Sequence, residues 1–147
     1  MENSPKIIAV DFDGTLAESA WPDIGRPIQS VIDALKAEQA AGCRTILWTS
    51  RCGDRLEAAV AWCAEQGIQL DAVNENLPEV LAFYGSDCRK VFADEYWDDR
   101  ARRMPEAETQ APGGASQISG LLAADKAEFD AIFSAQRRAS NITKEGY

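Results

Sequence analysis

Lys6–Leu16 reads K-I-I-A-V-D-F-D-G-T-L and is the most informative segment of the chain. Its first part, Lys6–Val10, is apolar after the lysine and is typical of a buried strand. Asp11 and Asp13 follow at once, and Gly14 allows the chain to turn. Because ligands of α/β proteins bind beyond the carboxyl ends of the strands, we expect both aspartates at the mouth of a site.

The spacing of the two aspartates predicts a metal site. Alternation along a strand places Asp11 and Asp13 on one side and Phe12 on the other. Neighbouring carboxylates repel each other unless a proton or a cation separates them. The simplest cation is Mg²⁺, which prefers oxygen ligands. A calcium EF-hand loop is not favoured, because Phe12 and Leu16 break its ligand pattern and a strand precedes it.

The composition narrows the chemistry. The chain of 147 residues contains no histidine, which removes Ser-His-Asp and Cys-His catalysis, histidine-ligated zinc and the usual general base. Carboxylates, hydroxyls, Lys, Arg, Cys and the backbone must therefore carry any reaction. The net charge of −9 argues against nucleic-acid binding over the whole surface, although a local basic rim is compatible with it.

Location is predicted from apolar stretches and cysteines. No apolar stretch approaches the roughly 20 residues that cross a bilayer, and the N-terminus has no pattern of a signal peptide. The four cysteines show no C-x-x-C spacing and are interpreted as reduced thiols. We expect a cytoplasmic protein without membrane contact.

Helix and strand signals alternate along residues 6–100, which predicts an α/β domain with a mainly parallel sheet. A helix is expected to open at Gly25–Pro27 and to end at Gly42, and a second one to begin after Asp54 as N-cap and to end at Gly67. The further expected elements are strands at 44–49, 68–73 and 90–97 and a short helix at 78–83.

Composition divides the chain into three parts. Residues 1–104 form the predicted catalytic domain. Residues 105–119 are rich in Pro, Gly, Ser, Ala, Gln and Glu and read as a linker. Apolar residues on one face then predict a helix within 120–147. That helix would pack either on its own domain or on a partner chain. In the second case the protein could be a homo-oligomer.

Four motifs in order resemble the haloacid dehalogenase superfamily of phosphohydrolases. The first is D-F-D-G-T at Asp11–Thr15, the second is the strand I-L-W-T-S ending at Thr49 and Ser50, the third is Lys90, and the fourth is Asp98-Asp99. The resemblance implies a three-layer Rossmann-like domain. The gaps between the motifs leave no room for a large cap domain. The chain is also similar to a small bacterial and phage branch of capless members, through W-P-D-I-G at 21–25, I-L-W-T-S-R at 46–51, D-A-V-N-E-N at 71–76 and A-D-E-Y-W-D-D-R at 93–100.

Each motif residue suits one part of phosphate-ester hydrolysis. Asp11 would be the nucleophile that forms an aspartyl-phosphate, and Asp13 the general acid and base. The presence of Asp13 favours phosphate over halide chemistry, since a halide leaving group departs without needing a proton. The proposed metal ligands are Asp11, Asp13, Asp98 and Asp99, with Asp99 favoured over Asp98 as the direct ligand. The proposed phosphate-binding residues are Gly14, Thr49, Ser50 and Lys90.

Four further residues are candidates for contact with the rest of the substrate. Trp21 lies in a segment that we expect to form a loop over the site. Arg51 and Arg55 share a helix face, and Arg100 follows Asp99. The alternatives are that Trp21 packs on the domain's own helices, that Arg51 pairs with Asp54 or Glu57, and that Arg100 pairs with Asp98.

Three functions are consistent with these residues. The first is a Mg²⁺-dependent phosphatase acting on a small phosphorylated substrate. The second is a nucleotide or nucleic-acid end phosphatase, suggested by the arginines after the second and fourth motifs. The third is a binding module that kept the fold without catalysis, against which the intact acidic motifs argue.

Overall fold

The apolar run after Lys6 forms β1 (Ile7–Val10), whose four residues are all buried. The computed structural model describes residues 4–105, and within them β1 belongs to a parallel sheet with the strand order β5-β4-β1-β6. In this sheet β4 (Arg44–Leu47) and β6 (Glu95–Trp97) flank β1, and β5 (Ala72–Val73) lies outside β4. The carboxyl ends of all four strands therefore point the same way.

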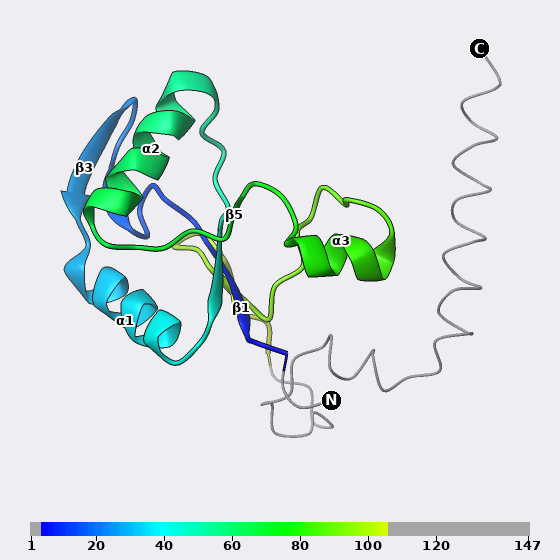
Figure 1. The fold of residues 1–147 in the computed structure, drawn as a ribbon. Coiled ribbons are helices and arrows are strands. Elements are labelled where there is room, and N and C mark those ends of the chain that lie inside the picture. The colour runs from blue at the N-terminus through cyan, green and yellow to red at the C-terminus, as the bar shows by residue number, and fades with distance from the viewer. Residues whose placement is uncertain (1–3, 106–147) are drawn as a thin grey trace, which may run out of the picture. The chain divides into compact units, whose positions relative to one another are not determined.

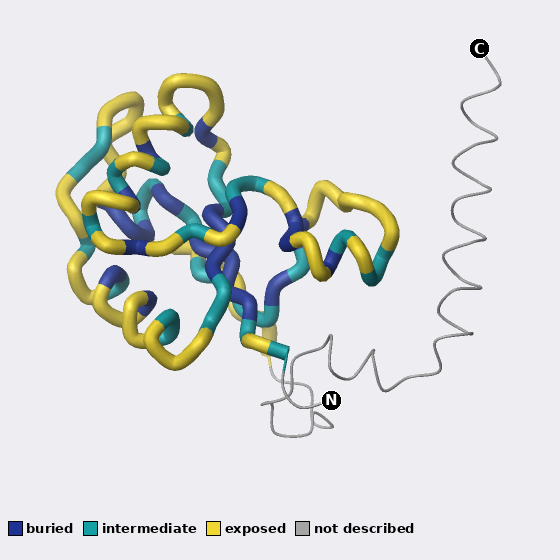
Figure 2. Tube along the Cα trace, in the orientation of Figure 1, coloured by how far each residue is buried: buried dark blue, intermediate teal, exposed yellow. Residues whose placement is uncertain are grey.

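Helices cover both faces of this sheet. In Figure 1, α1 (Gln29–Ala40) and α2 (Gly53–Glu65) lie on one side of the strands, and α3 (Pro78–Tyr84) lies on the other. Side chains of β1 pack against Ile32 and Leu35 of α1 and against Ala59 and Cys63 of α2 to form the core. Figure 2 shows the buried residues concentrated at the centre of this sheet, where all of β1 and most of β4 are buried. The predicted α/β class with a parallel sheet is confirmed.

A separate hairpin follows the turn after β1. It consists of β2 (Ala17–Ala20) and β3 (Asp23–Pro27), which pair antiparallel to each other. The expected helix is present as α1, but its predicted start at Gly25–Pro27 is wrong, because those residues belong to β3 and α1 begins at Gln29. The chain stays extended to this point because the Ile28 N–H donates to the Leu16 carbonyl, 2.8 Å away. The segment containing Trp21 lies outside the four-stranded sheet, as expected. It is not a loop, however, because it forms the hairpin turn and the beginning of β3.

Three strands are shorter than predicted, because side chains take up the backbone groups beside them. The Thr49 N–H donates to Asn74 Oδ1 at 2.8 Å, which ends the ladder of β4 at Leu47. The Phe92 N–H donates to Asn76 Oδ1 at 2.7 Å, so that β6 begins only at Glu95. The expected strand at 68–73 is reduced to Ala72–Val73. The N-cap of α2 is Cys52, and Asp54 lies in its first turn instead.

Some expectations fall beyond residues 4–105. The linker at 105–119, apart from its first residue, and the helix within 120–147 lie outside the described residues. Among the helices that the structure describes, none has the length and apolar character that a membrane span requires.

Asn76 organises the segment between β5 and β6, and its loss should destabilise the domain. Its buried amide donates to Asp87 Oδ1 at 2.7 Å and accepts from Phe92 N. We expect Asn76→Ala to lower the free energy of unfolding by about 2–3 kcal/mol, because buried polar partners lose their hydrogen bonds. Urea denaturation measures this loss. The exposed neighbour Glu75 provides the control, and an equal effect of Glu75→Ala would contradict the role of Asn76.

Candidate functional site

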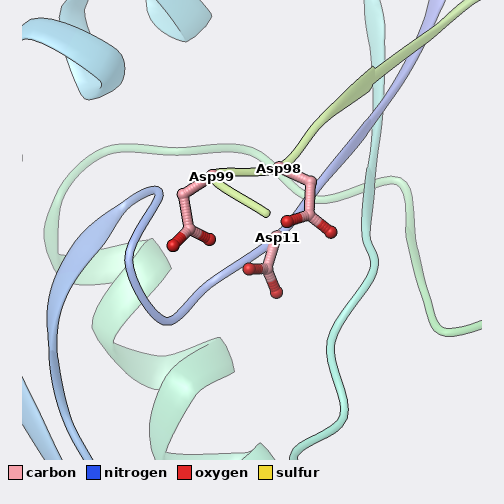
Figure 3. Close-up of side chains that lie close together, drawn as sticks. All are labelled: Asp11, Asp98 and Asp99. Atoms are coloured by element: carbon pink, nitrogen blue, oxygen red, sulfur yellow. The ribbon is translucent and has the colours of Figure 1, made fainter. Parts of the chain in front are cut away.

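Three carboxylates meet where β1 and β6 end. Asp11 directly follows β1, and Asp98 and Asp99 directly follow β6. The two strand ends are joined by the Asp11 N–H, which donates to the Trp97 carbonyl at 2.8 Å. One carboxylate oxygen from each residue lies within 4.8 Å of those of the other two, and Figure 3 shows the three side chains gathered together. We call this group the acidic cluster.

The electrostatics of Asp11 reflect this crowding. The pKa of Asp11 is raised from its usual 3.8 to about 6, and burial is the largest cause, to which the charges of Asp98, Asp99 and Asp13 add. A hydrogen bond from the Phe12 backbone opposes the shift. Every side-chain charge that contributes to this shift is negative. Such a group of oxygens suits a hard divalent cation, which would relieve the repulsion.

The turn after β1 holds Asp99 in place. Gly14 has a φ of +83°, and a Cβ at this position would collide with the Asp99 carboxyl carbon, 2.7 Å away. Next to it, the buried Thr15 hydroxyl accepts from the Asp99 N–H at 3.1 Å and approaches Asp99 Oδ1 at 3.4 Å. A glycine and a small hydroxyl residue are thus required for the two strand ends to approach.

Asp13 is engaged with Arg51 and not with the acidic cluster. Arg51 Nε donates to Asp13 Oδ2 and Arg51 Nη2 donates to Asp13 Oδ1, both at 2.7 Å. The hydrogen bonds to Asp13 are the largest cause that raises the pKa of Arg51. The structure therefore separates Asp13 from the three carboxylates that could share a cation.

The surroundings of Arg51 differ from both interpretations of the sequence. Its side chain is buried and pairs with Asp13, whereas a pair with Asp54 or Glu57 or a free role toward substrate was considered. Its remaining donors reach the carbonyls of Pro22 and Asp23 in the hairpin turn, at 3.4 and 2.8 Å. Four of the five guanidinium N–H groups donate to Asp13, Pro22 and Asp23, so that the pair with Asp13, and not a substrate, takes the planar fork of Arg51 in this structure.

The second motif lies at the end of β4. The Thr49 hydroxyl accepts from the Arg51 N–H at 3.2 Å, and its own O–H remains able to donate to a phosphate. Ser50 is exposed at the start of the following turn. Both residues thus follow the strand beside β1, at the edge of the sheet where Asp11 lies.

The other predicted residues are exposed. Lys90 precedes β6, and its Nζ lies 5.4 Å from the centroid of the Tyr96 ring. Trp21 is 61% exposed at the hairpin turn. Arg55 donates to the Pro22 carbonyl at 3.1 Å. The Arg100 N–H, and not its guanidinium, contacts Asp98, at 2.8 Å.

Two residues that shape the site were missed from the sequence. The D-F-D-G-T motif gives Thr15 no role of its own, yet its hydroxyl accepts from the Asp99 N–H. Asn74 adopts a φ of +52° and accepts from Thr49. Its signal was present in the sequence, since asparagine tolerates this left-handed conformation better than most residues.

The fold and the acidic cluster define an α/β protein with a site at the carboxyl ends of a parallel sheet. A conserved protein from Bacteroides thetaiotaomicron of known structure is 38% identical to this chain, with a TM-score of 0.60 over 70% of this chain and 84% of that chain. At this identity and coverage, the chain belongs to the same family as that conserved protein. No protein-family model and no curated protein matches the chain.

The close approach of Gly14 to Asp99 gives a test of the turn. We expect Gly14→Ala to destabilise the protein by about 2–4 kcal/mol, since the new Cβ combines backbone strain with a collision. Gly42→Ala is a matched control, because Gly42 has a φ of +97° and nothing lies within 4 Å of the added Cβ. Urea denaturation of both variants isolates the collision. Equal losses would show that Asp99 does not crowd Gly14.

The raised pKa of Asp11 predicts a pH-dependent stability. The folded state holds the Asp11 proton more tightly than the unfolded chain, so that this contribution to stability is lost as pH rises from about 4 to about 6. Without divalent cations, Asp11→Asn should therefore be more stable than the wild type at pH 7.5, by about 1 kcal/mol after solvent screening. The difference should vanish near pH 4. Denaturation at the two pH values measures it, and a destabilised variant at pH 7.5 would contradict the interpretation.

Proposed function

We propose that this protein is a Mg²⁺-dependent phosphatase of the haloacid dehalogenase type, which hydrolyses a phosphate monoester through an aspartyl-phosphate on Asp11. The observation that carries the proposal is the acidic cluster at the ends of β1 and β6. The motif order supports it further, because the residues that follow β1, β4 and β6 are those that such a reaction requires.

The donor set fits the proposed cation. Asp11, Asp98 and Asp99 offer carboxylate oxygens within 4.8 Å of one another. The raised pKa of Asp11 reflects its burial first and then the neighbouring negative charges, which a cation would compensate. When bound, Mg²⁺ would neutralise charge on the phosphoryl oxygens. Asp13 is left out of the ligand set that we propose from the structure, because its carboxylate is held by Arg51.

Asp11 and Asp13 would each act in both chemical steps of the reaction. In the first, an Asp11 carboxylate oxygen bonds to phosphorus while the bond from phosphorus to the ester oxygen breaks, and Asp13 gives that oxygen a proton. In the second, water bonds to phosphorus, Asp13 accepts a proton from it, and the bond between phosphorus and Asp11 breaks. The products are an alcohol and inorganic phosphate, and both aspartates return to their starting state.

Hydroxyls at the end of β4 would hold the phosphoryl group. Thr49 and Ser50 can donate hydrogen bonds to its oxygens. Gly14 is left out of this set, because the Asp99 carboxyl group fills the space beside it and its N–H donates to the Ala17 carbonyl at 2.7 Å. Lys90 would add positive charge. Its part in the proposal comes from its place in the motif order and not from its contacts, since its ammonium lies over the Tyr96 ring.

Catalysis on p-nitrophenyl phosphate tests the function. We expect turnover with Mg²⁺, none with excess chelator, and a loss on the order of 10³-fold or more in Asp11→Asn, because the variant lacks the nucleophile. Asp33→Asn on α1 is the control, since this exposed carboxylate is bonded to Gln29 and lies outside the acidic cluster. Its kcat should equal that of the wild type.

Two outcomes would contradict the proposal. Full activity of Asp11→Asn would exclude the covalent route. An inactive wild type on aryl, alkyl and nucleotide phosphates would favour a binding module. A preference for nucleotides or phosphorylated oligonucleotide ends in the same screen would instead define the substrate class.

A further inference from the structure

Arg51 is the most enclosed charged residue among those the structure describes. Only 2% of it is exposed, and its donors engage both oxygens of Asp13 and the carbonyls of Pro22 and Asp23. Its guanidinium carbon also lies 5.0 and 5.1 Å from the ring centroids of Phe12 and Trp21. Burial of a charged guanidinium lowers the stability of the folded state unless hydrogen bonds and an ion pair compensate it. Because these partners surround Arg51, they fix its side chain in one position.

We propose that Arg51 is a positioning residue, which acts through Asp13 by holding its carboxylate in the orientation needed for proton transfer. This inference rests on the proposed phosphatase function. Arg51 Nε and Nη2 each donate to a different oxygen of Asp13, which defines the plane of the carboxylate as well as its place. A single ammonium group would restrain one point only.

The pairing leaves Asp13 able to exchange a proton. A carboxylate has about four lone-pair sites, and the fork of Arg51 occupies one on each oxygen. The Asp13 side chain remains 23% exposed, whereas that of Arg51 is 1% exposed. Asp13 is therefore partly open to solvent, while Arg51 supports it from the interior.

The hairpin turn is part of the same support. The carbonyls of Pro22 and Asp23 accept from Arg51, so that β2 and β3 are linked to Asp13 through one guanidinium. Arg55 also donates to the Pro22 carbonyl, but it is half exposed and contacts the hairpin alone. The chain thus offers one arginine that holds both the hairpin and Asp13, and one that holds only the hairpin.

The leaving group distinguishes positioning from a structural role. An alkyl phosphate needs a proton on its departing oxygen, whereas p-nitrophenolate leaves without one. We compare kcat/KM for the two esters, because it reports the steps up to loss of the leaving group. Arg51→Met keeps an apolar side chain beside the rings of Phe12 and Trp21 and removes the guanidinium group. It should lower kcat/KM for the alkyl ester on the order of 10²-fold more than for p-nitrophenyl phosphate.

Three variants complete the experiment. Arg26→Ala, which removes an exposed arginine that pairs with Glu18 within the hairpin, should leave the ratio of the two kcat/KM values as in the wild type. In an Asp13→Asn background, Arg51→Met should not change the ratio further, because Arg51 acts through Asp13. Arg51→Lys should shift the ratio in the same direction by a smaller factor, and it carries the test if Arg51→Met does not fold.

The outcomes separate the two proposals. An active wild type with equal losses on both esters in Arg51→Met, or in Arg51→Lys where the former does not fold, would overturn the positioning role alone. An additive effect of Arg51→Met on Asp13→Asn would overturn it as well, by showing that Arg51 acts elsewhere. A wild type inactive on both esters would overturn the phosphatase function and this inference with it.

Discussion

Repulsion among carboxylates at the carboxyl ends of β1 and β6 is the constraint on which the rest of the site depends. Asp11 and Asp13 belong to the same turn, yet their charges are handled differently. Asp13 is matched by the guanidinium of Arg51, at 2.7 Å from each oxygen. Asp11 is surrounded by the charges of Asp98, Asp99 and Asp13, and burial raises its pKa to about 6. The negative charge of Asp13 is thus balanced by an arginine, whereas the ionised form of Asp11 would be stabilised by a bound cation.

The backbone around the strand ends makes this division feasible. Gly14 removes the Cβ that would strike Asp99, and Thr15 binds the Asp99 backbone, so that β6 can end beside β1. On the other side of β1, the Asn74 side chain accepts a hydrogen bond from the Thr49 N–H, and β4 ends early. The turn that follows β4 brings Arg51 beside Asp13. The short hairpin of β2 and β3 then covers Arg51 through two carbonyls. Each of these contacts joins segments that are distant in sequence.

Local sequence determined what could be predicted. The strand Ile7–Val10 and the helix from Pro78 follow from apolar runs and from a proline suited to a first turn, and both are present in the structure. The helix predicted from Gly25 is present as α1 but begins only at Gln29, because Pro27 suits an extended hairpin end equally well and the hydrogen bond from the Ile28 N–H to the Leu16 carbonyl keeps the chain extended. The pair of Arg51 and Asp13 joins residues 38 apart. No spacing rule distinguishes that partner from the nearby acids of α2.

The order of the strands in the chain has a consequence for synthesis. Asp11 is made early, but the Trp97 carbonyl that accepts from it and two members of the acidic cluster lie at residues 97–99. On the ribosome, β1 can pair with β4 once residue 47 has emerged, whereas its other edge stays open until β6 appears. A nascent chain therefore carries Asp11 and Asp13 before Asp98 and Asp99, two of the neighbours whose charges raise the pKa of Asp11, have been made. The acidic cluster can therefore form only after translation has passed residue 99.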